Sequence, residues 1–517
     1  MKTANSISLV ESKLACPENT RDDGDGLEEA NIQLSEIVVK KADDVNHMVN
    51  ISKHEEPLSP AACIASNTLV DSYILTIVGF KKEIDINSLK ISLQNNLGEH
   101  QRFSSIVVKD KHNNLKWCLR EVVIEEHVIV PSLSPSIAEN PYLVNEYTSS
   151  LVTAPPLNPC KPLWEVHVLN VPSEDAAASL VFRIHHSLGD CISMVSLILN
   201  STSKANNNSQ APPTIPQRTT ADQRPKGFLQ IVYNVLVRLW LTFVFLHEVG
   251  ITLLWKHDRN LLIGGRRADV CSKRLAYVTL GMDDICFVKK AVNGALNDVI
   301  MGALSAGLVR YMSRQQNDQV KNNSVPQRAT THKNSRLRAM VAVNMRQFPI
   351  LKDLDRNMKS PSKAMWGNKL GFWMFPFPMS HYGDPLQYCR DTTMMSRKKK
   401  LSFEASASYA ISKYMPTKLA AYLSKKFTTI LTLGFSNVMG PVEEIQYGDN
   451  PVAHIIPTAH VNNCSIVIHF ISYGGKGKLV ALVSEDVVPD PLQLCQDCAD
   501  ALQLMKQAAH GTSVHSS

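Results

Sequence analysis

A short polar segment between two apolar runs constrains this chain more than any other feature. Residues 180–184 have the pattern of a buried strand, residues 192–199 that of a helix, and His185-His186-Ser187-Leu188-Gly189-Asp190-Cys191 joins them. Two adjacent imidazoles at a strand end point to opposite faces, so only one can meet a given site. A neutral imidazole can take a proton from a hydroxyl group, and a nearby carboxylate can fix its orientation. The segment predicts a general base, with a structural strand end as the alternative.

Composition narrows the class of protein. The 517 residues allow two or three domains with cores of their own, and the contents of 44% hydrophobic and 20% charged residues are ordinary for a globular protein. A net charge of +7 suits an anionic cosubstrate or an anionic membrane surface. Because no nucleic-acid-binding motif accompanies the charge, no nucleic acid partner is expected.

Cysteine usage points to a reducing environment. The 11 cysteines are scattered and odd in number, which favours free thiols in a protein that faces the cytosol. Cys495 and Cys498 form one CxxC pair without a second pair or a redox context, so we expect a helix here and no metal site. Residues 1–20 lack the apolar core of a secretory signal.

The chain divides into segments by composition. Strand-like and helix-like patterns alternate in two halves, which predicts an α/β protein with two sandwich domains. Asp85 is a candidate N-cap for a helix at 86–97, and small residues in the helix expected at 297–312 would allow close packing. The predicted divisions are a mobile extension at 1–56, a first domain at 57–200, a Ser-, Asn- and Pro-rich linker at 201–226, an apolar helix at 227–256 and a second domain at 257–517.

Predicted strands and helices fall within both domains. Strands are expected at 69–80, 106–108, 115–123, 164–171 and 178–184 in the first, and at 275–280, 337–344, 464–473 and 479–483 in the second. Helices are expected at 86–97, 297–312, 418–431 and 491–508.

The apolar segment at 227–256 is the strongest candidate for contact with lipid. Its polar residues recur largely at i, i+4, which lays a narrow polar stripe along a helix: Gln230, Asn234, Arg238, Thr242, Glu248 and Thr252. Such a segment fits a helix in the plane of the membrane interface best. A tilted spanning helix and a helix packed on the protein remain alternatives.

Several motifs occur in the order found in one enzyme family. His-His-x-x-x-Asp resembles the active-site motif of coenzyme A-dependent acyltransferases, and the set as a whole resembles the plant bifunctional wax ester synthase/diacylglycerol acyltransferase family. The resemblance covers about residues 57–510. Its other motifs are Pro57-Leu58-Ser59-Pro60, Arg102-Phe103-Ser104-Ser105, Pro162-Leu163-Trp164, Asn297-Asp298-Val299, Asn344-Met345-Arg346, Gly367-Asn368 and Ser436-Asn437-Val438-Met439-Gly440-Pro441.

This resemblance implies a fold and an activity. The expected fold has two chloramphenicol-acetyltransferase-like domains with an active-site tunnel between them. The expected reaction moves a long-chain acyl group from acyl-CoA, a substrate, to a fatty alcohol or diacylglycerol, with no cofactor and no metal. Lipid substrates imply membrane lipid as a partner, at the cytosolic side of the endoplasmic reticulum or at the plasma membrane.

The resemblance also assigns roles to residues. It makes His186, the second of the pair, the general base, while His185 positions the loop. Asp190 braces the turn, with Arg346 as a candidate ion-pair partner. Further substrate-binding or oxyanion candidates are Asn297, Asp298, Asn437 and Gly440. For Asn297 or Asp298 helix capping is the alternative, and Asn437 with Gly440 resembles a structural turn at the domain junction.

One position departs from the family pattern. Cys191 stands where the family usually has glycine, and a thiol at a helix N-terminus can act as a nucleophile. Direct transfer without an acyl-enzyme remains the main hypothesis. A soluble acyltransferase acting on polar alcohols or amines, and a non-catalytic lipid-binding relative, are the alternative functions. The sequence ranks neither the two lipid acceptors nor acyl-chain lengths.

Overall fold

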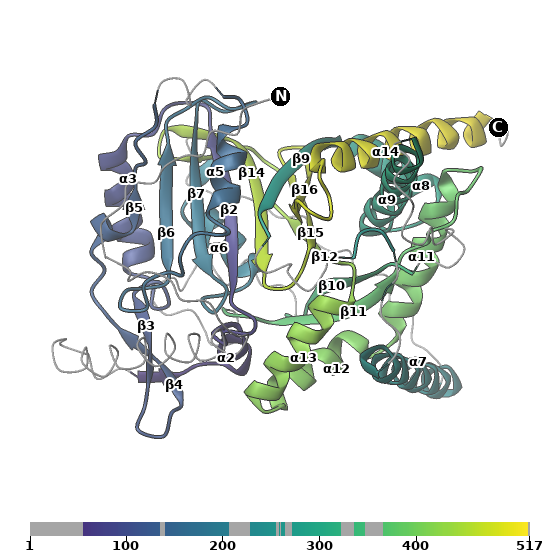
Figure 1. The fold of residues 1–517 in the computed structure, drawn as a ribbon, viewed down its shortest axis with the longest axis horizontal. Coiled ribbons are helices and arrows are strands. Elements are labelled where there is room, and N and C mark those ends of the chain that lie inside the picture. The colour runs from purple at the N-terminus through teal and green to yellow at the C-terminus, as the bar shows by residue number, and fades with distance from the viewer. Residues whose placement is uncertain are drawn as a thin grey trace, which may run out of the picture. The chain divides into compact units, whose positions relative to one another are not determined.

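The computed structural model describes residues 55–134, 140–205, 228–254, 258, 260–263, 271–321, 336–346 and 366–514. The predicted extension at 1–56 and linker at 201–226 lie almost wholly outside these residues. The chain separates into residues 1–51 and 52–517, and the fold below is that of the second unit (Figure 1).

A seven-stranded sheet forms the centre of the first half. Its strand order is β5-β6-β7-β2-β14-β13-β8. All nine residues of β2 are buried, as the run of β-branched and aromatic residues predicts. The strands expected at 69–80, 164–171 and 178–184 are confirmed. The bounds are β2 Ser72–Phe80, β5 Val128–Ile129, β6 Trp164–Leu169, β7 Ala178–His185, β8 Ser203–Lys204, β13 Ile445–Tyr447 and β14 Asn450–Val461.

Two strands of that sheet come from the second half of the chain. β14 pairs antiparallel with β2, for example Ile455 with Val78, and β13 continues the sheet to β8. Figure 1 shows β14 in yellow-green between β2 and the strands of the second half. The predicted second domain at 257–517 includes β13 and β14, although these strands lie in the sheet of the first half. Local sequence patterns carry no information on pairing between strands hundreds of residues apart.

A small three-stranded sheet, β1-β4-β3, lies beside the first half. The hairpin predicted between 106–108 and 115–123 is confirmed as β3 Ser105–Lys109 and β4 Leu115–Leu119, with β1 Glu55–Pro57 on the other side of β4. Its turn contains Asn113, whose φ of 62° is a conformation that Asn tolerates.

Helices cover both faces of the seven-stranded sheet. α3 (Ile86–Leu93), which Asp85 caps as predicted, and α6 (Cys191–Asn200) contribute to one apolar cluster, with Leu89 and Leu197. On the other face, α5 (Leu143–Ser150) and strands of the second sheet form another cluster. The two sheets therefore share a hydrophobic core.

The second half holds a six-stranded sheet of order β11-β10-β12-β15-β16-β9. The strands expected at 275–280, 337–344, 464–473 and 479–483 are confirmed, whereas β11 and β12 were not predicted. The bounds are β9 Lys273–Gly281, β10 Arg338–Asn344, β11 Leu370–Pro376, β12 Leu433–Met439, β15 Ile466–Tyr473 and β16 Lys476–Ser484.

Four helices pack against the six-stranded sheet: α8 (Met282–Ala291), α9 (Leu296–Lys321), α11 (Leu386–Leu401) and α14 (Pro491–Val514). The close approach predicted for the small residues of α9 is confirmed. A Cβ atom on Gly302 would lie 2.7 Å from the Cys389 Sγ atom, and one on Gly307 would meet Cys498. Cys495 and Cys498 are buried in α14, as the helical interpretation of this pair requires.

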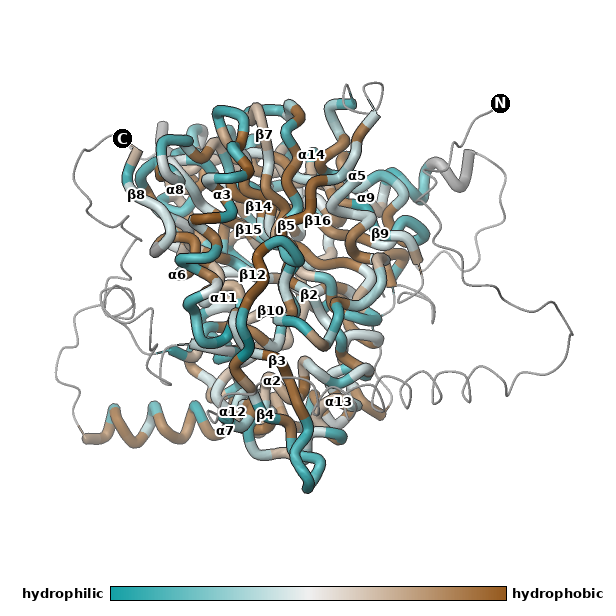
Figure 2. Tube along the Cα trace, turned by 90° about the vertical axis from the view of Figure 1, so that its left-hand side faces the viewer, coloured by the Kyte–Doolittle hydropathy of each residue, from teal (hydrophilic) through white to brown (hydrophobic). Residues whose placement is uncertain are grey.

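The predicted apolar helix exists as α7 (Phe228–Leu254), and three of its polar residues contact the protein, whereas Gln230 and Glu248 are exposed. The Thr242 hydroxyl accepts from the Phe403 backbone N–H at 3.0 Å, and the Thr252 hydroxyl accepts from Arg338 at 2.6 Å. The Arg238 guanidinium lies 5.6 Å from the centre of the Phe403 ring. Only Phe245 and Thr252 are buried. Figure 2 shows this mostly hydrophobic helix beside α12 (Glu404–Tyr414). α13 (Thr417–Ile430) contacts α7 as well.

Candidate active site

His186 is held in one orientation by a residue of the second half. Its Nδ1 atom lies 3.0 Å from the Asn368 Oδ1 atom, and the Asn368 amide nitrogen donates to the His186 carbonyl at 2.7 Å. Since the amide nitrogen is the donor in the second contact, Oδ1 must accept in the first, so Nδ1 carries the proton. The lone pair therefore resides on Nε2, the nitrogen available to act as a base.

The surroundings keep this imidazole neutral. Burial lowers the pKa of His186 from its ordinary value, and the positive charge of His185 adds to the effect, while the Asp190 carboxylate opposes it. A neutral imidazole at pH 7 can accept a proton, which is the state that a general base requires.

His185 points the other way and serves the turn. Its Nδ1 atom accepts from the Ser187 backbone N–H at 3.2 Å, and its Nε2 atom lies 3.1 Å from Asp71 Oδ1. The ring packs edge-on against Tyr73, with centroids 5.4 Å apart. These contacts support a positioning role for His185.

Asp190 is the N-cap of α6 and the centre of a buried ion pair. Its carboxylate accepts from the Ser193 backbone N–H at 3.0 Å and contacts Arg346 through both oxygens, at 2.7 and 3.0 Å. The predicted partnership with Arg346 is confirmed. The Lys369 backbone N–H donates to the same carboxylate at 3.0 Å, so Asp190 joins the turn to two segments of the second half.

Gly367 completes this junction. Its φ of +100° is a conformation that a side chain would strain, and its carbonyl accepts from Arg346 and from the Ser193 hydroxyl. This geometry presents the next residue, Asn368, to His186.

Two of the oxyanion candidates contact each other. The Asn437 amide nitrogen donates to Asn297 Oδ1 at 3.2 Å, while the Asn297 amide nitrogen has a sulfur acceptor, Met301, at 3.9 Å. Asn437 lies within β12, so its predicted place in a turn is wrong. The pair joins β12 to the start of α9.

The other two candidates have structural contacts. Asp298 is buried, and its Oδ2 accepts from the Ala295 backbone N–H at 2.8 Å, which is the reach-back contact of a capping box. The capping alternative is therefore confirmed for Asp298. Gly440 follows β12, and a Cβ atom there would collide with the Ser472 carbonyl of β15. Gly440 thus permits close strand packing.

Cys191 is the first residue of α6, but its thiol resists ionisation. Burial, with the negative charge of Asp190 as the second cause, raises the pKa of Cys191 to about 12. These effects outweigh the stabilisation that a helix N-terminus gives to a thiolate. The arrangement favours direct transfer over an acyl-enzyme on Cys191.

Replacing Cys191 with serine should change kcat by less than about threefold, because a poorly ionised thiol contributes no nucleophile. The measurement is steady-state acyl transfer, with Cys160→Ser as the matched control for thiol loss. A fall of 100-fold or more in Cys191→Ser alone would contradict direct transfer.

A pocket of about 290 Å³ opens beside the catalytic turn. Ser187, Leu188 and Asn368 line it near the base, and α12 forms another wall with Tyr409, Ser412 and Lys413. Trp366 lies in the same lining and donates from its indole N–H to the Leu188 carbonyl at 2.7 Å. The contact from Asn368 to His186 makes this pocket an approach to the base. The predicted tunnel itself stays a prediction.

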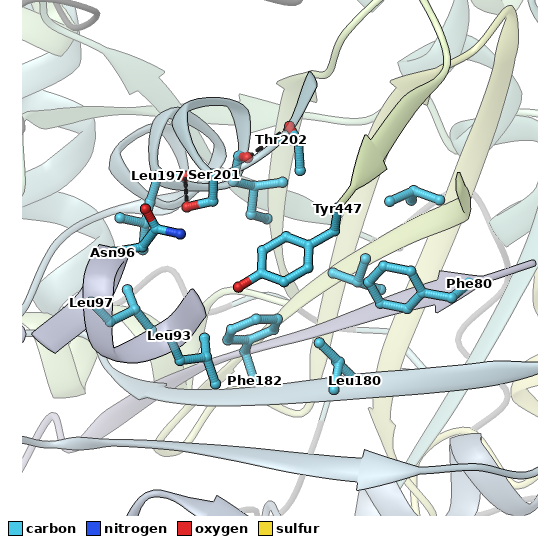
Figure 3. Close-up of a pocket in the computed structure, with 13 residues that line it drawn as sticks. Phe80, Leu93, Asn96, Leu97, Leu180, Phe182, Leu197, Ser201, Thr202 and Tyr447 are labelled. Carbon is cyan, nitrogen blue, oxygen red and sulfur yellow. Dashed lines mark hydrogen bonds between the residues drawn. The ribbon is translucent and has the colours of Figure 1, made fainter. Parts of the chain in front are cut away.

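A second, almost wholly apolar pocket lies on the sheet face that carries His186. Phe182 and Leu180 of β7, two and three alternate positions before His186, line it together with Leu197 of α6 and Leu93 of α3. Figure 3 shows the Tyr447 ring in the middle of this lining. Its walls favour an apolar group over a polar one, but its volume of about 40 Å³ holds only a short segment of an alkyl chain.

Sequence reasoning missed the functional importance of two residues. One is Asn368, which lies in the Gly367-Asn368 motif, although no sequence pattern indicated that it contacts His186. His469 of β15 is buried on the strand face of Ile471 and Tyr473, which pack with first-half residues. Burial and the charge of His186 lower the pKa of His469 to about 4. Within the described part of the chain, its Nδ1 atom has no hydrogen-bond partner. Strand alternation gives the face of His469, but no local pattern shows that this face meets the catalytic turn.

Two family models match the chain in the regions that build this site. The wax ester synthase/diacylglycerol acyltransferase catalytic domain matches residues 143–300, and the C-terminal domain of the same family matches residues 366–506. Wax ester synthase/diacylglycerol acyltransferase 5 of Arabidopsis thaliana is 32% identical, over 92% of this chain and 96% of that protein. The chain belongs to this family. It is therefore an acyltransferase.

Other relatives agree with the family membership. Wax ester synthase/diacylglycerol acyltransferase 11 of Arabidopsis thaliana is 32% identical, over 88% of this chain and 95% of that protein. The wax ester synthase/diacylglycerol acyltransferase of Marinobacter aquaeolei VT8 matches the structure with a TM-score of 0.56 at 15% identity, covering 88% of this chain and 100% of that one. A condensation domain of the calcium-dependent antibiotic synthetase matches with a TM-score of 0.55 at 12% identity, covering 88% and 97% of the two chains. The two-domain α/β fold expected of the family is confirmed.

Replacing Asn368 with aspartate should raise the pKa at which activity is lost in acid by about one unit or more. A carboxylate beside Nδ1 favours the imidazolium form of His186, so protonation disables the base at a higher pH. The check is the pH dependence of kcat/KM between pH 5 and 9 for the wild type, Asn368→Asp and Asn368→Ser. If the pH at which kcat/KM declines in acid is the same in a folded Asn368→Asp protein as in the wild type, the contact between residue 368 and His186 does not control the base.

Proposed function

We propose that this acyltransferase moves a long-chain acyl group from acyl-CoA to a fatty alcohol, to diacylglycerol, or to both, at a membrane surface. The main support for this reaction is the orientation of His186. Asn368 contacts its Nδ1 atom, so Nε2 remains available as the base. The relatives are named for wax ester synthesis and for diacylglycerol acylation, and these names support the two classes of lipid acceptor.

In this mechanism His186 Nε2 takes the hydroxyl proton as the acceptor oxygen bonds to the thioester carbonyl carbon. The tetrahedral intermediate then expels the coenzyme A sulfur, which receives the proton from His186. Asn297 is the proposed donor to the developing oxyanion. Its support is the contact from Asn437, which occupies Asn297 Oδ1 and leaves the amide nitrogen with only a weak sulfur acceptor.

The α7 helix supports membrane association. It is 27 residues long, and it is long and apolar enough to cross a membrane. Leu229, Trp240 and Phe243 are 82%, 64% and 60% exposed, although three of its polar residues contact protein. A helix with its apolar side outward is stable only where something other than water covers it. α7 packs on the protein along one side, through Phe245 for example, but this packing leaves its large apolar residues uncovered.

Replacing Leu229, Trp240, Phe243 and Leu246 together with serine should weaken binding to liposomes by about 100-fold or more. Each large apolar side chain contributes roughly 1.5–3 kcal/mol when it leaves water. Liposome flotation measures the bound fraction, and Gln230→Ser is the control on the same helix. Unchanged flotation would show that α7 does not hold the protein on the membrane, and carbonate extraction separates a surface helix from a spanning one.

The cellular setting follows from these substrates. The proposed location is the cytosolic side of the endoplasmic reticulum, where long-chain acyl-CoA and membrane lipid meet, with the plasma membrane as the alternative. The proposed chemistry takes acyl-CoA as a substrate and needs neither a cofactor nor a metal.

The test is acyl transfer by purified protein in liposomes. Palmitoyl-CoA is supplied with hexadecanol, with diacylglycerol or with a small polar alcohol, and His186→Ala is the comparison. Ester formation from a lipid acceptor that the variant loses is the expected result, and the product ratio ranks the two acceptors. Transfer only to the polar alcohol would favour a soluble-type acyltransferase, and lipid binding without transfer would favour a non-catalytic relative.

A further inference from the structure

The pocket beside the catalytic turn carries an excess of positive charge. Its charged lining residues are Arg102, Lys369 and Lys413 against one carboxylate, Glu56. Arg102 and Glu56 form an ion pair at 2.8 Å, and the Arg102 guanidinium lies 5.2 Å from the centre of the Trp117 ring. The two lysines therefore set the net charge of the pocket.

The lysines come from elements that meet at the mouth of the pocket. Lys369 directly follows Asn368, and its backbone N–H contacts Asp190. Lys413 projects from α12 and is exposed. Burial is the largest cause that lowers the pKa of Lys369; the charges of Arg346 and Lys413 lower it further, while the Asp190 carboxylate opposes them. Cations placed this close repel one another, and an anion bound between them would relieve the repulsion.

The rest of the lining is suited to an uncharged arm. Leu188, Trp366 and Ala62 are buried apolar residues of the same pocket. The pocket thus combines a cationic outer part with apolar walls that lead to Asn368 and His186. A ligand that fits both parts has phosphate groups at one end and a long, mostly uncharged chain at the other.

We propose that this pocket is the port for the acyl donor, in which Lys413 and Lys369 bind phosphate groups of acyl-CoA while the pantetheine arm passes Trp366 and Leu188 to reach His186. The proposal rests on the proposed use of acyl-CoA and adds which opening and which residues receive it. Lysines bind phosphate as flexible point charges, so no fixed bidentate geometry is required.

A second source of phosphate lies close to the same pocket. α12 contacts α7 as well as α2 (Pro60–Ala65), so a phosphate of an anionic lipid headgroup could approach Lys413 from the membrane. Donor phosphates fit better, because the pocket that holds both lysines also contains Asn368, the residue in contact with His186. The experiment separates the two sources.

The test compares two donors in detergent with a fixed amount of hexadecanol. Palmitoyl-CoA carries phosphates, whereas palmitoyl-S-N-acetylcysteamine is a thioester without them. For Lys413→Gln we expect KM for palmitoyl-CoA to rise about 10-fold, the loss typical of one charge-assisted contact, and kcat/KM for the phosphate-free donor to change less than twofold. Lys413→Arg should restore most of the affinity, and Lys289→Gln, an exposed lysine on α8, is the charge-matched control.

Three other outcomes have distinct meanings. Equal KM values for palmitoyl-CoA in the wild type and Lys413→Gln would overturn the donor port. Unchanged KM together with weaker flotation on phosphatidylserine vesicles would assign Lys413 to lipid headgroups and also overturn it. No transfer by the folded wild type from either donor would instead refute the proposed function on which this inference depends.

Discussion

Replacing His186 with alanine should lower kcat by about 10²–10⁴-fold, the range that positioned general bases contribute. The loss should fall on kcat more than on KM, because Nε2 acts on the hydroxyl proton in the transition state. Acyl transfer from palmitoyl-CoA to hexadecanol is the measurement. His112→Ala, a histidine in the exposed hairpin turn, is the matched control.

The wild-type pH profile gives an independent check on His186. Because burial lowers the pKa of His186 below the ordinary value for histidine, kcat/KM should hold its plateau as the pH falls to about 6.5 and decline only below it. Full activity in a folded His186→Ala protein would refute the base assignment.

Replacing Asp190 with alanine should destabilise the protein by about 3–5 kcal/mol. The substitution leaves Arg346 buried without its carboxylate, which is the costly way to break a buried ion pair. It also removes the N-cap of α6, worth roughly 1 kcal/mol. Chemical denaturation measures the change in the free energy of unfolding.

A matched surface pair serves as the control for Asp190. Arg390 and Asp384 contact each other at 2.5 Å, but their side chains are 45% and 46% exposed. Asp384→Ala should therefore cost less than about 1 kcal/mol. If Asp190→Ala cost no more than Asp384→Ala, the buried pair would not hold the two halves together. The double variant Asp190→Ala, Arg346→Met should recover part of the loss, because it removes the stranded charge.

Four other buried histidines make the stability of the folded protein depend on pH. His100, His454 and His460, like His469, have pKa values lowered to about 4, with burial as the largest cause. The unfolded chain binds protons at these sites near pH 6.5, whereas the folded chain does not. Their contribution to stability is complete above pH 6.5 and declines as the pH falls toward 4.

Many of the strands and helices could be predicted from the sequence, because each depends on the pattern of neighbouring residues. The alternating and continuous apolar runs located β2, β6, β7 and β15, and Asp85 marked the start of α3. The strand, turn and helix around His185 and His186 were also predictable from neighbouring residues. Strand alternation placed the two histidines on opposite faces, and the family resemblance then selected His186. The polar stripe of α7 was visible as well, but not that Thr242 and Thr252 contact other segments of the protein.

Only the tertiary structure decided what completes the site. Asn368 fixes the His186 tautomer, and Arg346 holds Asp190, although each partner lies more than 150 residues away in the chain. β14 enters the first sheet by pairing with β2, which lies more than 350 residues away in the chain. The charge state of the buried His469 depends on His186 of the other half. Strand periodicity and helix capping arise from neighbours in sequence, so the sequence by itself determined the elements and marked the histidine pair, while the family resemblance named His186 as the proposed base. Contacts between distant segments form only when the halves pack, and these contacts set the charge state and orientation of that base.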